Sequence, residues 1–253
     1  MRDNPPVALP RFYTPDLDAD RRQATIGADE TRHLARVMRL SPGDEVAVFD
    51  GRGHEFRARV DTVARETVRV TLIEPLTPAR APKVAMTLVQ AVLKGERMDD
   101  AVRDATMIGV TTIVPVVSEH VVVRGNALAQ GRPADRWRRV ALASAKQCRR
   151  ATLPVIRQPE PLAAWLASPS GGQRLIFVEP TVAGPRESLR TLWDRPAPER
   201  VSILVGPEGG WAADEVEAAI GAGCTPVSLG DLTLRADAVP MVALAMCRLL
   251  WDD

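Results

Sequence analysis

VSILVGPEGGWAADEVEAAIGAGCTPVSLGDLTLRADA, residues 201–238, decides the fold of the C-terminal part of the chain. Two apolar runs in this stretch each end in a glycine-containing loop, and the segment between them carries apolar residues at helical spacing. The expected elements are a strand at 201–205, a loop at 206–210, a helix at 212–222, a strand at 225–229 and a loop at 230–235. This order is typical of an α/β fold with a parallel sheet, in which a ligand binds at the carboxyl ends of the strands.

The loop Gly206–Gly210 is the first candidate ligand site. Glycine loops before helices most often hold phosphates on backbone N–H groups, but no Gly-Lys-Ser/Thr sequence follows this one and a GxGxxG pattern is missing. Glu208 also lies in the middle of the loop, where its carboxylate would repel a polyphosphate. Three interpretations stay open: a structural turn, a phosphate-binding α/β enzyme, or a site for a phosphate-free adenosine cofactor such as S-adenosylmethionine.

Length and composition exclude several classes of protein. The 253 residues allow one large or two modest domains, and a net charge of +1 excludes a generally basic nucleic-acid binder. Three cysteines without Cys-x-x-Cys spacing and three scattered histidines predict neither a disulfide framework nor a metal site. A signal-peptide core is missing, and the longest apolar run, residues 238–247, is about half as long as a membrane helix. We therefore expect a cytoplasmic protein without a metal or a membrane partner.

Residues 1–73 have the pattern of a small β-rich domain. Alternating apolar residues predict strands at 45–49, 55–60 and 68–72, with a hairpin turn at 50–53. A short helix is expected from about Glu30 to Leu40, with Asp29 as its N-cap. Its inward face is expected to comprise Leu34, Val37 and Met38. A basic stripe on another face comprises Arg32, Arg36 and Arg39, and the spacing alone fits a solvated surface as well as an RNA contact.

A proline-rich segment, residues 74–83, has the composition of a linker, and a second domain is expected from residue 84 to residue 253. In this domain apolar runs alternate with helical patterns, which predicts an open parallel α/β sheet. Besides the elements of 201–238, we expect strands at 84–93, 111–117 and 174–178 and helices at 96–108, 134–150 and 162–166.

Positive charge is concentrated in residues 124–157, which hold nine lysine or arginine residues and one acidic residue. Most of this charge lies on the expected helix 134–150, whose apolar stripe includes Trp137 and Cys148. The basic residues expected on its outer surface are Arg136, Arg138, Arg139, Lys146, Arg149 and Arg150. Such a surface suits non-specific attraction to a phosphate backbone, and solubility is the alternative explanation.

Seven motifs follow one another in the order found in a known family. They are PRFY at 10–13, HLARVMRLSPGDEVAVFDGRG at 33–53, LVQAVLKGERMD at 88–99, KQCRRATLP at 146–154, GPEGGW at 206–211, SLG at 228–230 and LR at 234–235. Through these motifs nearly the whole chain resembles the SPOUT superfamily, and within it the RsmE-like 16S rRNA (uracil-N3)-methyltransferases.

The resemblance implies a small N-terminal PUA-like β-barrel that binds RNA and a C-terminal SPOUT-type α/β domain with a trefoil knot. It implies S-adenosylmethionine as the cofactor, and small-subunit ribosomal RNA or the assembled small subunit as the partner. It also implies a homodimer with the cofactor site near the interface. The final expected helix, 237–251, is apolar on nearly every side and must therefore be buried on every side, which a second subunit would achieve.

Site residues carry over with the motifs. The expected cofactor-binding residues are Val178, Glu179, Gly206, Pro207, Glu208, Gly209, Gly210, Leu229, Gly230 and Leu234. The expected RNA-binding residues are Arg11, Arg32, Arg36, Arg39, Arg136, Arg139, Gln147, Arg149 and Arg150. Arg235 and Asp237 are the expected catalytic residues, because an arginine that donates to the uracil carbonyl oxygens would stabilise the uracil anion. The alternative for Arg235 and Gln147 is that they only brace the loops.

The chain departs from the family pattern at several of these positions. Ala236, Asp237 and Ala238 stand where the family usually has Thr-Glu-Thr, and Met107 and Lys146 replace glutamates. Ala212 also replaces the usual serine cap. Shortening a carboxylate by one methylene moves it by about 1.5 Å, which damages a pre-aligned site if that group carries chemistry. An RNA-binding paralogue that no longer transfers methyl groups is therefore the alternative function.

Overall fold

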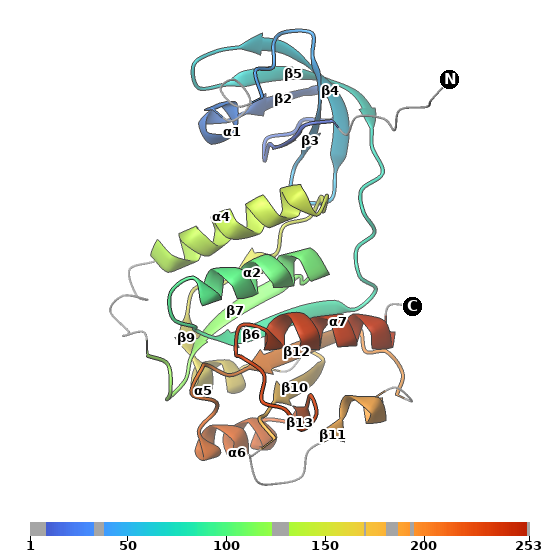
Figure 1. The fold of residues 1–253 in the computed structure, drawn as a ribbon. Helices are drawn as coiled ribbons and strands as arrows, with labels where there is room; N and C mark the ends of the chain where they lie inside the picture. The colour runs from blue at the N-terminus through green and yellow to red at the C-terminus, as the bar shows by residue number, and fades with distance from the viewer. Residues whose placement is uncertain are drawn as a thin grey trace. The chain divides into compact units, whose positions relative to one another are not determined.

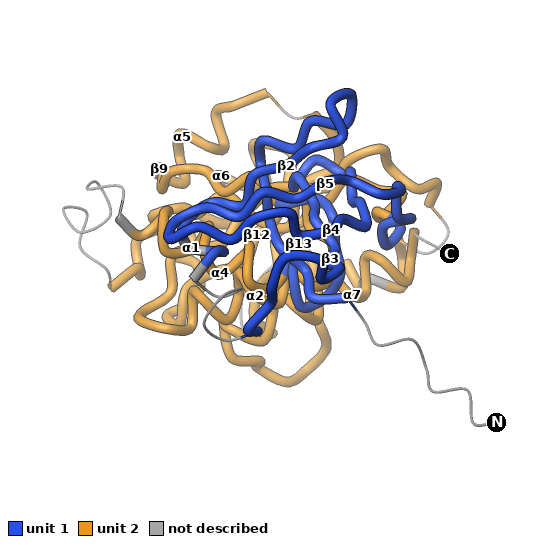
Figure 2. Tube along the Cα trace, turned by 90° about the horizontal axis from the view of Figure 1, so that it is seen from above, with its two compact units in different colours: residues 1–80, 145–153 blue, residues 81–144, 154–253 orange. Residues whose placement is uncertain are grey.

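The computed structural model describes residues 9–32, 38–122, 132–169, 171–180, 187–192 and 195–251, without the side chains of Asp29, Arg32, Arg132 and Leu189. The chain divides into two compact units, which Figure 2 colours separately. Unit 1 comprises residues 1–80 and 145–153, and unit 2 comprises residues 81–144 and 154–253. The proline-rich segment 74–83 begins within the last strand of unit 1 and crosses the boundary between Arg80 and Ala81.

Unit 1 contains a curled five-stranded sheet with the order β1-β3-β4-β5-β2 (Figure 1). Its strands are β1 (Arg11–Tyr13), β2 (Gln23–Ile26), β3 (Glu45–Phe49), β4 (Glu55–Val63) and β5 (Val68–Pro75). β1 pairs with β3 in parallel, and the other neighbours are antiparallel. Side chains that alternate along the strands enclose one apolar core, which includes Phe12, Ile26, Val48, Val60 and Leu72.

The helix predicted from Glu30 to Leu40 is wrong at its C-terminal end, and the predicted N-cap, Asp29, lies within the helix. α1 spans Ala28–Arg32, and residues 38–40 are not helical. Arg39 has a φ of 54°, outside the helical region, and Met38 is exposed rather than inward. A turn that starts at Ser41 opposes a longer helix, because Pro42 restricts the residue before it to extended conformations. The other predicted members of the two faces, Leu34, Arg36 and Val37, lie outside the described residues.

Unit 2 contains an eight-stranded parallel sheet with the order β11-β13-β10-β12-β6-β7-β8, and β9 also pairs with β7. Its strands are β6 (Ala85–Ala91), β7 (Thr112–Val117), β8 (Val155–Ile156), β9 (Glu160–Pro161), β10 (Gln173–Phe177), β11 (Glu187–Ser188), β12 (Arg200–Val205) and β13 (Cys224–Ser228). The five strands predicted from apolar runs in this unit are confirmed, and the short β8, β9 and β11 extend the sheet at its edges.

Helices cover both faces of this sheet, which makes three layers (Figure 1). α2 (Arg97–Ile108), α4 (Arg132–Gln147) and α7 (Val239–Trp251) pack on one face, and α5 (Leu162–Leu166) and α6 (Ala213–Gly221) pack on the other. A short 3₁₀ helix, η2, spans Leu189–Leu192. Neighbouring residues of the central strands enter opposite cores: Ile203 packs with α2 and α7, whereas Leu204 packs with α5 and α6.

The last helix, α7, is buried on one side only in the single chain. Its buried residues are Pro240, Ala243, Leu244, Cys247 and Trp251. Its exposed apolar residues are Met241, Val242, Met246 and Leu249, with Leu249 58% exposed. The expectation that this helix is buried on every side therefore does not hold within one subunit, because the core of unit 2 contacts only the side that faces α2, β6 and β12.

Candidate active site

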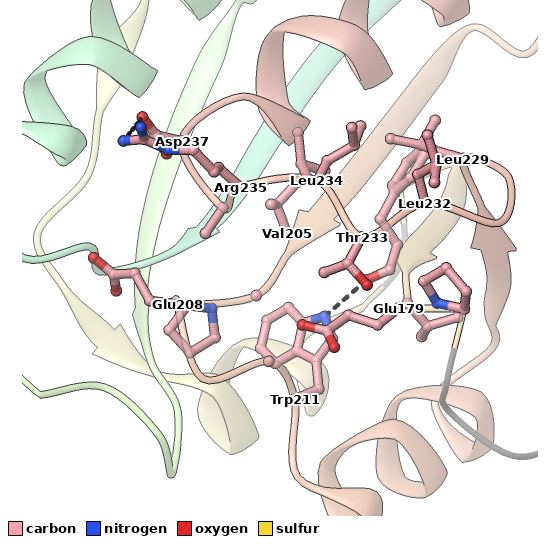
Figure 3. Close-up of a pocket in the computed structure, with 18 of the residues that line it drawn as sticks. Glu179, Val205, Glu208, Trp211, Leu229, Leu232, Thr233, Leu234, Arg235 and Asp237 are labelled. Atoms are coloured by element: carbon pink, nitrogen blue, oxygen red, sulfur yellow. Dashed lines mark hydrogen bonds and ion pairs between the residues drawn. The ribbon is translucent and has the colours of Figure 1, made fainter.

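A pocket lies at the carboxyl ends of β10, β12 and β13 in unit 2, where the order of elements predicts a ligand. Its volume is about 530 Å³, within the range of sites for small ligands. Glu208, Arg235 and Asp237 lie on one side of the pocket, and Leu229 and Leu232 lie on the opposite side (Figure 3). The lining residues are Arg97, Phe177–Pro180, Val205–Glu208, Gly210, Trp211, Leu229, Gly230, Leu232–Asp237 and Val239.

Two side chains hold the glycine loop after β12 in place through hydrogen bonds to backbone carbonyl oxygens. The Gln90 Nε2 group donates to the carbonyl oxygens of Val205 and Gly206 at 3.4 and 3.3 Å, and its side chain is fully buried. The Trp211 Nε1 group donates to the Phe177 carbonyl at 3.1 Å, which ties the end of the loop to β10. A Cβ atom at Gly206 would lie 3.3 Å from the Trp211 ring, so this close packing favours a residue without a side chain.

Gly210 is restricted more tightly than Gly206. Its φ of +69° lies in the left-handed region, and a Cβ atom there would lie 3.1 Å from the Glu179 Oε1 atom. His120 approaches the same loop from the end of β7, with its Nδ1 atom 3.1 and 3.2 Å from the Gly209 and Gly210 carbonyls. Because carbonyls only accept, Nδ1 carries the proton. The loop therefore presents its backbone to the pocket, as a cradle for a ligand requires.

Glu208 connects the loop to residues outside it. Its Oε1 atom accepts hydrogen bonds from the Lys94 backbone N–H at 3.1 Å and the Arg97 Nη1 group at 3.0 Å. Burial opposes the ionisation of Glu208, but hydrogen bonds from backbone N–H groups and from Arg97 outweigh it and lower the pKa. Glu208 is therefore a carboxylate at neutral pH, which argues against a polyphosphate ligand.

Arg235 and Asp237 form a two-pronged ion pair at the rim. The Arg235 Nε and Nη2 groups donate to the two Asp237 oxygens, each at 3.0 Å. Burial opposes ionisation of Asp237, but these hydrogen bonds and the nearby Arg97 charge lower its pKa. The Arg235 side chain is 72% exposed, so its remaining Nη1 group is accessible to a substrate.

The charge of the lining residues fits a cationic ligand. Three carboxylates, of Glu179, Glu208 and Asp237, face two guanidinium groups, of Arg97 and Arg235, and no lysine is among the lining residues. S-adenosylmethionine carries a sulfonium and an ammonium against one carboxylate, so its net positive charge complements this set. Within the ranges that the structure describes, no group of three or more histidine, cysteine or acidic residues is arranged to hold a metal ion.

The structure brings together nearly all residues that the motifs assign to the cofactor. Nine of the ten line the pocket, and the exception is Gly209, whose Cα faces His120 instead. Asp237 and Arg235 line the same pocket. Sequence reasoning missed the other nine lining residues, which are Arg97, Phe177, Pro180, Val205, Trp211, Leu232, Thr233, Ala236 and Val239. Arg97 comes from a helix more than a hundred residues away in the chain, and only the parallel pairing of β6 with β12 places that helix beside the loop.

The basic residues predicted to bind RNA fall into several environments. Arg139 and Arg149 are exposed, as is Gln147 at the end of α4. Arg136 is also exposed but pairs with Asp99. Arg39 is exposed in unit 1, whereas Arg36 and the side chain of Arg32 lie outside the described residues.

Three basic residues are not on the outer surface, and for Lys146 and Arg150 this contradicts the prediction. The Arg11 side chain is 9% exposed, pairs with Glu55 at 2.6 Å and stacks 4.1 Å from the centre of the Phe49 ring. Lys146 donates to both oxygens of Glu30, at 3.0 and 2.7 Å. Arg150 is largely buried, and this burial lowers its pKa. The helical pattern predicted exposure for both residues because it contains no information about distant parts of the chain, such as Glu30 of α1, which pairs with Lys146.

Comparison with known proteins agrees with this site. A family model described as an RNA methyltransferase domain matches residues 80–248, and one described as an RNA methyltransferase PUA domain matches residues 26–73. A Mycobacterium bovis protein named ribosomal RNA small subunit methyltransferase E is 31% identical over 95% of this chain and 93% of its own length. Among the described residues, no helix has both the length and the apolar character needed to cross a membrane.

Two solved structures share the fold over nearly their whole length. One, from Legionella pneumophila, is described as a methyltransferase in complex with its bound cofactor SAM; it has a TM-score of 0.88 at 26% identity and covers 98% of this chain and 100% of its own. The other is ribosomal RNA small subunit methyltransferase E from Neisseria gonorrhoeae bound to S-adenosyl methionine, with a TM-score of 0.84, 28% identity and coverage of 96% and 98%. The chain therefore belongs to the PUA-containing RNA methyltransferases named ribosomal RNA small subunit methyltransferase E, the RsmE family that its motifs indicate.

Proposed function

We propose that the protein transfers a methyl group from S-adenosylmethionine to N3 of a uridine in the 16S rRNA of the small ribosomal subunit. The observation that carries this proposal is the pocket itself, in a chain whose Neisseria relative binds the same cofactor. It is lined by glycine backbone and three carboxylates and contains no lysine. A ribosomal RNA substrate implies that the protein acts in the cytoplasm.

The pocket residues divide into two groups by their chemistry. The backbone of the loop 206–210 and of residues 229–230, with Val178, Glu179 and Leu234, would hold the cofactor. When bound, S-adenosylmethionine supplies a methyl group on a sulfonium, and its transfer to N3 requires the loss of the N3 proton. Uracil N3 is a poor nucleophile while protonated, so a group that stabilises the uracil anion accelerates transfer.

Arg235 is the residue best placed to stabilise that anion. Its Nη1 group is not used in the ion pair with Asp237 and lies on an exposed side chain, so it can donate to a uracil carbonyl oxygen. Asp237 has a lowered pKa, which makes it a weak proton acceptor, and its two hydrogen bonds hold the guanidinium plane in one orientation. We therefore assign Arg235 a catalytic role and Asp237 a positioning role.

We further propose that unit 1 is a PUA-like RNA-binding barrel and that unit 2 is a SPOUT-type knotted domain that forms a homodimer through α7. The support for the dimer is the exposed apolar stripe Val242, Met246 and Leu249, which has the i, i+4, i+7 spacing of one helix face. α7 begins beside the pocket, because Val239 and Asp237 line it. A partner on α7 would therefore lie close to the cofactor.

The dimer can be tested with one charged substitution on each of two exposed apolar positions. Leu249→Asp is expected to convert the protein to a monomer in sedimentation or light-scattering measurements, because a carboxylate in a dry interface is strongly destabilising. The matched control is Ile220→Asp on α6, which is 43% exposed and should leave the mass unchanged. A wild-type protein that is monomeric at micromolar concentration would refute the dimer.

The function itself is tested with small ribosomal subunits that lack the modification. Incubation with labelled S-adenosylmethionine, followed by nucleoside mass analysis, is expected to yield 3-methyluridine. Detection of a different methylated nucleoside would show that the proposed target, N3 of a uridine, is wrong. If no methyl group is transferred although calorimetry detects cofactor binding, the protein is the RNA-binding paralogue, and Ala236→Thr with Asp237→Glu should then restore transfer.

A further inference from the structure

We propose that the tip of the β3–β4 hairpin, residues 50–54, and the adjoining residues 149–152 form a preorganised site for the sugar-phosphate backbone of RNA. The inference rests on the proposed function only in taking RNA as the partner. All of these residues belong to unit 1. The tip was expected to be an ordinary hairpin turn, and none of residues 50–54 has a role in the pocket of unit 2.

The buried Asp50 carboxylate holds the tip together by accepting hydrogen bonds from Arg52 and His54. Its side chain is 1% exposed, and its Oδ1 atom accepts from the backbone N–H groups of Arg52 at 2.7 Å and His54 at 3.1 Å. Its Oδ2 atom accepts from the Arg52 Nε group at 3.0 Å and the His54 Nδ1 group at 2.8 Å. Burial opposes the ionisation of Asp50, but these four donors outweigh it and lower its pKa to about 2.

The hydrogen bonds to Asp50 determine which atoms of Arg52 and His54 reach solvent. An ionised carboxylate only accepts, so His54 carries a proton on Nδ1 and directs its Nε2 edge outward from a side chain that is 68% exposed. The Arg52 side chain is 66% exposed and is held at one edge by Asp50 and at Nη2 by the Pro15 carbonyl, 3.2 Å away. Both side chains are thus anchored at one end and accessible at the other.

A second chain segment adds positive charge beside the tip. The Leu153 N–H group donates to the Gly51 carbonyl at 2.8 Å, and the Gly53 N–H group donates to the Ala151 carbonyl at 3.1 Å. The approach is close, because a Cβ atom on Gly51 would lie 3.0 Å from the Leu153 and Tyr13 side chains. These contacts place the segment that carries Arg149 and Arg150 against the hairpin.

The balance of charge at the tip favours an anionic partner. Asp50 is saturated by its four donors, and Glu55 next to the tip is paired with Arg11. Asp16 contributes a carboxylate close to Tyr13, against the exposed guanidinium groups of Arg52 and Arg149. Guanidinium and imidazole groups held in fixed orientation suit phosphate oxygens and ribose hydroxyls, which position an RNA without reading its sequence.

A purely structural role for the hydrogen bonds of Asp50 and an RNA-binding role for the tip predict different effects of substitution. Stability requires the carboxylate of Asp50 but not the solvent-facing ends of Arg52 and His54. The decisive variants are therefore Arg52→Gln and His54→Asn, whose amide N–H groups can replace the Arg52 Nε and His54 Nδ1 donors to Asp50 while the solvent-facing ends are lost. The matched control is Arg65→Gln, which removes an exposed charge from the turn at the other end of the nine-residue strand β4, about 30 Å away.

Two measurements separate these possibilities. With unmodified small subunits, Arg52→Gln is expected to raise KM about fivefold and His54→Asn about threefold, with kcat and cofactor affinity unchanged and the melting temperature close to that of the wild type. With a labelled 16S rRNA fragment, Arg52→Gln should lower the slope of log affinity against log salt by roughly 1, and Arg65→Gln should not. Equal behaviour of Arg52→Gln and Arg65→Gln overturns the proposal, as does equal competition by an acidic polypeptide. Because the salt slope needs no methyl transfer, it tests this site even if the proposed reaction fails.

Discussion

The chain contains two glycine loops that each follow a buried strand and each carry a carboxylate, but the two carboxylates are used differently. In residues 50–54 the Asp50 carboxylate is 1% exposed and accepts four hydrogen bonds from its own loop. In residues 206–210 the Glu208 carboxylate is 25% exposed and accepts from Lys94 and Arg97, outside its loop. The first carboxylate therefore stabilises its own loop, which displays side chains, whereas the second connects its loop to residues elsewhere in the chain, and that loop lines the pocket with its backbone.

The largest effect is expected from Gly210→Ala in the second loop. The new Cβ atom would lie 3.1 Å from Glu179 in a backbone conformation that L-residues rarely adopt, so the loop must shift. We expect cofactor affinity to fall roughly 10- to 100-fold in calorimetry, since a strain of a few kcal/mol is set directly against binding. Gly221→Ala is the control, because its Cβ atom meets nothing within 4 Å. Unchanged affinity in both variants would mean that the loop does not contact the cofactor.

The next largest effect is expected in the first loop, from Asp50→Asn. The substitution removes the charge that the four donors stabilise, and we expect a loss of about 2 kcal/mol at neutral pH, measured by thermal unfolding. Cofactor affinity should not change, because Asp50 belongs to the other unit.

The pH dependence of this difference has a defined sign. Because the pKa of Asp50 is lowered to about 2 in the folded state, its contribution is complete above the unfolded value near 4 and is lost as the pH falls from about 4 to about 2. The melting temperatures of the wild type and Asp50→Asn should therefore converge over this range. A gap that stays constant down to pH 2 would contradict the assigned role of the carboxylate.

A smaller effect is expected from Glu208→Gln. The pair with Arg97 is half exposed on the arginine side, so its contribution to stability should stay within about 0.5 kcal/mol. Glutamine keeps an acceptor for the Lys94 N–H group, and we expect the affinity for cofactor to fall only about threefold in calorimetry. If the Glu208 carboxylate stabilised its own loop as Asp50 does, the melting temperature of Glu208→Gln would fall as far as that of Asp50→Asn.

These two loops also show what sequence patterns can and cannot predict. The strands before both loops and the helix after the second were predicted, because burial sets their apolar periodicity locally. The predicted cofactor residues that line the pocket in 206–210 and at Leu229, Gly230 and Leu234 could be predicted because their motifs are contiguous. Arg97, His120 and Gln90 reach the same loop from other strands and helices, and their positions depend on the order of strands in the sheet.

The same limit explains the errors in unit 1. Helical periodicity extended a helix to Leu40 because apolar and basic residues continue at the right spacing, although Pro42 and the conformation of Arg39 end it earlier. It also predicted that Lys146 and Arg150 are exposed, whereas Lys146 pairs with Glu30, more than a hundred residues away. A knot cannot be predicted from such patterns either, because threading of the chain does not change the local periodicity of apolar residues.

The smallest effect is expected from Ala212→Ser, which makes the second loop more like the first. Ala212 is the N-cap of α6 and has no side-chain acceptor, although Glu215 already accepts from its backbone N–H at 3.1 Å. A serine would complete this reciprocal arrangement and should stabilise the protein by about 0.5–1 kcal/mol, whereas Ala213→Ser, one residue inside the helix, should not. An unchanged melting temperature would show that the end of the loop is already fixed by Trp211. If the temperature rises and cofactor affinity rises with it, then order in the loop limits binding; if affinity stays constant, the neighbours Gln90 and His120 already hold the cradle in its binding conformation.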